Sequence, residues 1–133
     1  MTPGRLTWRD GMGALALLGA AGPVMAALIA SHAAGRAVMP AFMALLPPAR
    51  RDGLSASAGQ PPLGSVAAAA VLGVLILILC LGFGHGLAAL IVLAIAAALI
   101  AWLSLHQIGG QTGDVLGAVE QVSEIAILLV ALW

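Results

Sequence analysis

The sequence predicts an all-α, polytopic membrane protein, a transmembrane bundle of about four to five membrane helices. Of the 133 residues, 62% are hydrophobic and only 8% are charged, and the mean hydropathy is +1.15. A water-soluble domain of this composition has too little polar sequence to cover its surface. Apolar windows long enough to cross about 30 Å of hydrocarbon, at about 1.5 Å per helical residue, recur along the chain. Two polar segments rich in turn-forming residues separate them.

Four of the apolar windows are long enough to span a bilayer, and a fifth is shorter. The four cover residues 13–31, 64–82, 87–105 and 115–133. The fifth window, residues 33–46, contains Arg36 and Pro40, so we expect a tilted, kinked or partly re-entrant helix there. Residues 13–133 therefore form the predicted transmembrane domain, which follows a short cytoplasmic segment, residues 1–12.

The two polar segments, residues 47–63 and 106–114, are predicted cytoplasmic loops. Arg50 and Arg51 place the first loop in the cytoplasm, because short translocated loops are depleted of arginine. From there the chain crosses the membrane, turns at residues 83–86 and crosses back. Both loops therefore lie on the cytoplasmic face of a multi-pass membrane protein.

The N-terminal arginines, Arg5 and Arg9, fall on the same face if residues 13–46 form a helical hairpin. They also precede the apolar stretch in the manner of a secretory signal, but that stretch continues to Ala30 and is long enough to span. The lipid bilayer is thus an expected partner. Nucleic acid is not, since the chain has no lysine and its arginines are dispersed. The single Cys80 excludes an intrachain disulfide framework and a cysteine metal site.

The second polar loop leads into a helix with carboxylates on one face. At about 100° per residue, Asp114, Glu120 and Glu124 fall within a sector of about 120°. Acids one turn apart in a low-dielectric setting stay ionised only beside a cation or a base. Mg²⁺ is a hard ion that accepts carboxylate oxygen together with phosphate oxygen, so these acids are candidate metal ligands.

The residues before this helix favour an anion. Their glycines, Gly109, Gly110 and Gly113, allow a tight bend that exposes backbone amides beside a helix N-terminus, where phosphate is favoured. The guanidinium of Arg36 suits a phosphate or a carboxylate. Structural alternatives remain open for each feature: the glycines form only a turn, Asp114 only caps the helix, Arg50 only sets topology, and Glu120 or Glu124 pairs with Arg36.

Two stretches of the sequence resemble one family. The run 108–118 (IGGQTGDVLGA), with Glu120 and Glu124 after it, resembles the C-terminal signature of cobalamin synthases, the adenosylcobinamide-GDP ribazoletransferases. Residues 34–39 (AGRAVM), followed by a proline, an arginine at position 50 and a Gly-Leu pair, are similar to another family segment. The order and spacing agree, and the resemblance covers about residues 13–133.

The resemblance implies an inner-membrane enzyme that joins adenosylcobinamide-GDP to α-ribazole or its phosphate, releases GMP and requires Mg²⁺. Carried over by position, Arg36 and Arg50 would contact phosphate. The loop residues Gly109, Gly110, Thr112 and Gly113 would shape and line the same substrate site. Asp114, Glu120 and Glu124 would contact the metal or polar substrate groups.

The chain also departs from this family. Members are about twice as long, and their N-terminal half carries an acidic motif expected to bind the catalytic metal, which is absent here. We therefore expect a C-terminal half that acts with a partner carrying the missing half, or as a homo-oligomer. The alternatives are a small transport or channel subunit that uses Arg36, Glu120 and Glu124 as an ion or proton path, or an inactive truncated form.

Overall fold

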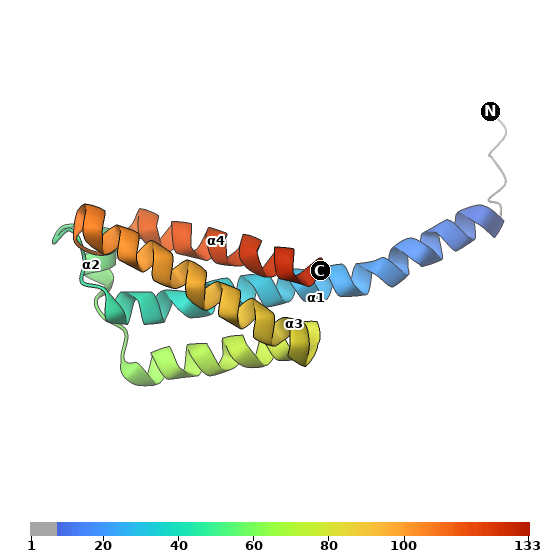
Figure 1. Cartoon of the computed structure of the whole chain (residues 1–133), viewed down its shortest axis with the longest axis horizontal. Coiled ribbons are helices and arrows are strands. Elements are labelled where there is room, and N and C mark those ends of the chain that lie inside the picture. Colours follow the sequence, from blue (N-terminus) through green and yellow to red (C-terminus); the bar gives the residue numbers. More distant parts are fainter. Residues whose placement is uncertain (1–7) are drawn as a thin grey trace, which may run out of the picture.

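The computed structural model describes residues 8–133, with side chains from residue 21 onward. Its helices are α1 (Trp8–Leu45), the short α2 (Leu54–Ala58), α3 (Leu63–Ile108) and α4 (Gly113–Ala131) (Figure 1). Within this range there is no β-strand, only an isolated bridge between Pro48 and Gln111. The all-α prediction is therefore confirmed. Arg5, with the first part of the predicted N-terminal segment, lies outside the described residues.

Helix α3 consists of two antiparallel arms rather than one rod. Gly82 has φ 78° and ψ 167° inside the helical run, and the ribbon reverses its direction there (Figure 1). This region of backbone space is essentially restricted to glycine. The two arms match the predicted helices 64–82 and 87–105, but one glycine makes the turn that was expected over residues 83–86. Just beyond it, a Cβ on Gly86 would lie 3.0 Å from the Ile78 Cα atom, so the arms begin in close contact.

Helix α1 is continuous where two segments were expected, so the predicted hairpin of residues 13–46 is wrong. The helix includes both Pro23 and Pro40. A proline removes one backbone hydrogen bond, and helices in membranes tolerate this loss where neighbours satisfy the freed groups. Residue 9 therefore lies at the opposite end of α1 from the loop after Leu45, and no hairpin brings Arg9 to that loop.

Both interhelical loops lie at one end of the bundle, drawn on the left in Figure 1. Helix α1 ends there, α3 begins and ends there, and α4 begins there. The second loop is shorter than predicted, because α3 continues to Ile108 and leaves only residues 109–112 outside helices. The first loop contains α2. The turn at Gly82 and the C-terminus lie at the other end.

Small residues allow α1 to pack closely between α3 and α4. A Cβ on Gly73 of α3 would lie 2.6 Å from the Ala37 Cβ, and a Cβ on Gly35 would lie 3.0 Å from the Glu124 Cγ. Close approach through small residues is the usual way in which membrane helices associate. One buried cluster joins all three helices; it contains Ala30, Ala34, Leu77, Ala89, Leu93 and Ile127.

The outer surface of the bundle is apolar. Leu79 is 81% exposed and Leu99 is 62% exposed, and many other large apolar side chains also point outward. Among the described residues, two helices are long and apolar enough to cross a membrane: Ala21–Leu45 of α1, with 28% of its most apolar window buried, and α3, with 11%. The core helix of a soluble protein would be mostly buried. The two helices therefore indicate a membrane protein. Helix α4 is not one of them, since it carries three carboxylates.

Candidate functional site

The two loops are joined by backbone hydrogen bonds. The Ala49 N–H donates to the Gln111 carbonyl oxygen at 2.8 Å, and the Gln111 N–H donates to the Pro47 carbonyl oxygen at 2.8 Å. The Ser104 hydroxyl donates to the carbonyl oxygen of Gly110 and ties the same segment to the end of α3. We call residues 47–49 and 110–111 the loop strap. It fixes the loop after α1 against the start of α4.

Two glycines make the loop strap possible. Gly109 has φ 78°, and its N–H donates to the Leu105 carbonyl oxygen at 3.2 Å, so α3 ends with the left-handed residue that glycine favours. A Cβ on Gly110 would overlap the Pro47 carbonyl oxygen and lie 3.0 Å from the Ala49 nitrogen. Only glycine allows this approach without moving the loops apart. The predicted loop-shaping role of both glycines has a definite geometric cause.

Thr112 is the N-cap of α4. Its Oγ1 accepts a hydrogen bond from the Val115 N–H at 3.3 Å, and its extended backbone (φ −130°, ψ 170°) directs the chain into the helix. Gly113 is the first helical residue and Asp114 lies in the first turn. The alternative in which Asp114 caps the helix is therefore wrong. The exposed Asp114 carboxylate sits beside the amide end of the helix, where the macrodipole stabilises negative charge.

A pocket of about 480 Å³ lies where the two loops meet. The loop after α1 contributes Arg50, together with Gly53 and Ser55, and the start of α4 contributes Gly113 and Asp114. Thr112, Leu54, Ile108 and Val115 complete the lining. Arg50 and a helix N-terminus both favour phosphate. Asp114 repels an anion unless a cation lies between them, so the pocket suits a phosphate group accompanied by a cation.

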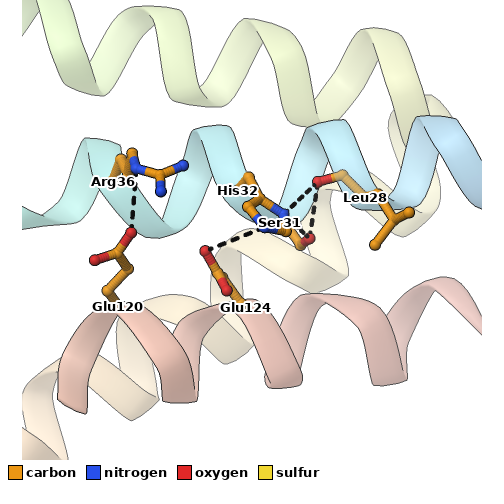
Figure 2. Close-up of polar contacts among 6 residues, drawn as sticks. All are labelled: Leu28, Ser31, His32, Arg36, Glu120 and Glu124. Carbon is orange, nitrogen blue, oxygen red and sulfur yellow. Dashed lines mark hydrogen bonds and ion pairs between the residues drawn. The ribbon is translucent and has the colours of Figure 1, made fainter. Parts of the chain in front are cut away.

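A second polar group lies deeper in the bundle, between α1 and α4 (Figure 2). The Arg36 Nε lies 3.2 Å from the Glu120 Oε1, and the His32 Nε2 lies 3.9 Å from the Glu124 Oε1. The His32 Nδ1 lies 2.9 Å from the Leu28 carbonyl oxygen, and a donated hydrogen bond there turns Nε2 toward the glutamate. The structural alternative in which Arg36 pairs with Glu120 is thus confirmed.

The structure separates the predicted site residues into two groups. Arg50, Thr112, Gly113 and Asp114 line the loop pocket. Arg36, which was expected to share that pocket, does not line it. It lies nine residues before the end of α1, about 14 Å deeper at 1.5 Å per residue. The phosphate contact predicted for Arg36 therefore stays a prediction without support from the geometry.

The three carboxylates predicted to bind metal do not gather. Over the part of the chain that the structure describes, no group of three acidic, histidine or cysteine side chains is placed to hold an ion. Glu120 and Glu124 instead face bases on α1. Asp114 alone lies at the loop pocket. One carboxylate combined with substrate phosphates is a common arrangement for Mg²⁺, so this chain fits the role of one protein ligand and not that of a complete metal site.

Two polar residues near the site were not predicted from the sequence. Gln111 is 2% exposed, and its Oε1 is buried without a hydrogen-bond partner among the described residues. A buried acceptor left unpaired costs about 1–3 kcal/mol. His32 was given no role, although its position four residues before Arg36 matches the four-residue spacing of Glu120 and Glu124. This matching four-residue spacing was the sequence signal from which the pairing of His32 with Glu124 could have been predicted.

The fold and the site together define a membrane-type helical protein with a phosphate-suited pocket between two loops at one end of the bundle. Comparison with known families then identifies it further. The sequence profile described as cobalamin-5-phosphate synthase matches residues 11–132. The chain belongs to this family, as the resemblance predicted.

Several curated relatives carry the name adenosylcobinamide-GDP ribazoletransferase. The protein of Bradyrhizobium diazoefficiens is 60% identical over 108 residues, which is 81% of this chain and 42% of the relative. The protein of Mesorhizobium japonicum is 60% identical over 105 residues, 79% of this chain and 40% of the relative. That of Azorhizobium caulinodans is 41% identical over 129 residues, 94% of this chain and 47% of the relative. The chain thus spans less than half the length of these relatives. No solved structure matches it.

Proposed function

We propose that this chain is the pocket-bearing part of a membrane-embedded adenosylcobinamide-GDP ribazoletransferase. Family membership and the names of the relatives support the activity. The observation that carries the proposal is the loop pocket, in which the loop strap holds Arg50 against the N-terminus of α4. Two elements that bind phosphate thereby face one space at the mouth of the bundle.

The proposed reaction is a phosphoryl transfer. A hydroxyl oxygen of α-ribazole, or of its phosphate, forms a bond to the phosphorus on the cobinamide side of the pyrophosphate. The bond from that phosphorus to the bridging oxygen breaks, GMP leaves with that oxygen, and the hydroxyl proton passes to solvent. The product is adenosylcobalamin or its phosphate. In such a reaction a protein contributes mainly position and charge, so Arg50 and the amides after Thr112 would hold the pyrophosphate in place.

Mg²⁺ remains a proposal for the complete enzyme. Asp114 would be the ligand that this chain supplies, and phosphate oxygens and protein groups outside the chain would supply the others. When bound, the ion would neutralise charge on the leaving nucleotide. Glu120 and Glu124 are left out of this proposal because their carboxylates face Arg36 and His32.

We also infer a topology of four membrane passes. They are residues 21–45 of α1, the two arms of α3, and α4, in which Glu120 and Glu124 face bases on α1. The loop end carries Arg50 and Arg51, so the positive-inside rule places the pocket on the cytoplasmic side of the cell inner membrane. The substrates would then reach the site from the cytoplasm.

The transport alternative receives less support from the geometry. An ion or proton path through the bundle would use Arg36, Glu120 and Glu124, yet Arg36 and Glu120 offset each other's charge at 3.2 Å. Such a path would also have no need of the pocket between the loops.

The test measures GMP released from adenosylcobinamide-GDP in the presence and absence of α-ribazole. We compare the purified chain, the chain expressed together with the unmatched portion of the Bradyrhizobium diazoefficiens relative, and that relative at full length. We expect the chain alone to bind adenosylcobinamide-GDP without releasing GMP, and the combination to release it. Failure of the chain to bind adenosylcobinamide-GDP, with the full-length relative active, would reject the proposal.

A further inference from the structure

Helices α1 and α4 pack against each other in antiparallel directions, and their facing positions repeat every four residues. A move of four residues toward the N-terminus of α1 corresponds to a move of four residues toward the C-terminus of α4. We call these positions the α1/α4 seam: Arg36 pairs with Glu120 and His32 pairs with Glu124, and the same step reaches the positions Leu28 and Leu128 and then Val24 and Leu132. The first two pairs are polar. The other two line an apolar pocket of about 300 Å³ toward the far end of the bundle.

The polar part of the seam is open on one side. The Arg36 side chain is 64% exposed and the His32 side chain is 48% exposed, whereas Glu120 and Glu124 are 22% and 21% exposed. Arg36 contacts Glu120 through its Nε, which leaves its two terminal nitrogens outside that contact (Figure 2). Among the described residues, these terminal nitrogens have no hydrogen-bond partner. The guanidinium therefore keeps its flat, two-pronged edge free for another carboxylate or amide.

This exposure is incompatible with a lipid neighbour. Arg36 lies about 14 Å from the loop end of α1 and His32 about 20 Å, at 1.5 Å per residue, so both side chains are at mid-depth of a hydrocarbon core about 30 Å thick. Charged side chains at that depth are costly in lipid and almost always face protein or a water-filled cavity. Elsewhere on the bundle, exposed side chains such as Leu79 and Leu99 are purely apolar. The seam is therefore the side of the bundle that protein must cover.

We propose that the α1/α4 seam docks a transmembrane helix from the portion of the family that this chain does not span. The relatives from Bradyrhizobium diazoefficiens and Mesorhizobium japonicum are more than twice as long as their matched segments, which leaves ample sequence for such a helix. The helix would offer a carboxylate or amide to the terminal nitrogens of Arg36 and an apolar face to the pocket at Leu28 and Leu128. This proposal rests on the proposed function only for the identity of the partner, because the cost of exposed charge applies to any membrane protein.

The test uses photocrosslinking from two positions of matched depth. A photoreactive residue replaces Gln121, which is exposed beside Glu120 and Glu124 on α4, or Leu99, which is exposed on the second arm of α3, after Gly82. The full chain is expressed with the tagged, unmatched portion of the Bradyrhizobium diazoefficiens relative, and only membranes containing both are irradiated. We expect at least fivefold more crosslink to that portion from position 121 than from position 99. Equal yields, or a product between two copies of this chain, would overturn the proposal.

A second measurement does not depend on the partner. In the chain alone, replacing both polar pairs by apolar residues (Arg36→Met with Glu120→Met, His32→Leu with Glu124→Leu) removes the groups that lipid does not tolerate. We expect this variant to resist denaturation in bilayers better than the parent chain, yet to lose the crosslink from position 121. A variant that unfolds more easily in lipid, or that keeps the crosslink, contradicts the docking role. Neither measurement depends on catalysis. The docking proposal can therefore be tested even if the GMP assay fails.

Discussion

The replacement Gly110→Ala tests whether the loop strap builds the pocket. The added Cβ would overlap the Pro47 carbonyl oxygen and press on the Ala49 nitrogen at 3.0 Å. Both contacts are with backbone, which cannot rotate away as a side chain can. The loops must therefore separate, which removes the two backbone hydrogen bonds of the strap. At about 0.5–1.5 kcal/mol for each bond, the variant loses about 1–3 kcal/mol of stability.

The separation also moves Arg50 away from the N-terminus of α4. A hydrogen bond between charged groups contributes about 1.5–3 kcal/mol, so the loss of one phosphate contact weakens binding about 10- to 100-fold. We would measure the dissociation constant for adenosylcobinamide-GDP with the chain in lipid nanodiscs, and the unfolding of the same samples by circular dichroism. Both quantities should change together.

Gly64→Ala is the matched control. Gly64 lies in the first turn of α3, near the same end of the bundle, and a Cβ there would have nothing within 4 Å. Alanine is favoured over glycine in a helix by up to about 1 kcal/mol, so this variant should bind normally and be at least as stable. If Gly110→Ala behaves like Gly64→Ala, the strap does not hold the pocket together and the reasoning is refuted.

Three further results are expected. Arg50→Gln should weaken binding of adenosylcobinamide-GDP about tenfold or more, whereas Arg51→Gln, at an exposed position outside the pocket lining, should change it less than twofold; equal effects would mean a general electrostatic attraction. Thr112→Ala should cost about 1 kcal/mol of stability, measured by denaturant unfolding, and Thr112→Ser should recover most of it, since the cap oxygen is retained. In a double-mutant cycle with Arg36→Met and Glu120→Gln, the coupling energy should be about 0.6–1.7 kcal/mol, and a value near zero would show that the pair does not form in the membrane.

The sequence predicts the membrane-length helices better than it predicts the residues at which they begin, end or turn. Residues 64–82 and 87–105 were visible because an apolar run of membrane length is a strong signal. The turn was placed a few residues late because any of several glycines there would permit one, and only packing selects Gly82. The break expected near Arg36 was wrong for a different reason. A charged residue in an apolar stretch suggests an interruption, but Glu120 lies opposite it, and that partner is 84 residues away in the sequence.

The candidate site was predictable in composition and not in arrangement. The Gly-Gly pair, Thr112 and Asp114 identified a helix mouth, and Arg50 identified a loop on the same face. Their meeting in one pocket depends on the bond pattern between Pro47, Ala49 and Gln111, which residue types do not encode. Carboxylate spacing alone also grouped Asp114 with Glu120 and Glu124. A shared helical face shows which side chains point the same way, and not which bases on other helices engage them.

The polar side chains of the loop pocket and those between α1 and α4 lie at different depths and have different roles. At the loop end, an exposed carboxylate and an arginine face one pocket that is open to water, where a charged substrate can exchange. Deeper in the bundle, each acid faces a base, and the two terminal nitrogens of Arg36 need an acceptor from another helix. An acceptor docked there would hold α4 through Glu120, two turns below the residues that cap and line the pocket. The partner helix would thereby steady the start of α4, whereas the loop strap, which lies within this chain, already positions Arg50 against it. Substrate binding by the chain alone therefore does not require the partner helix.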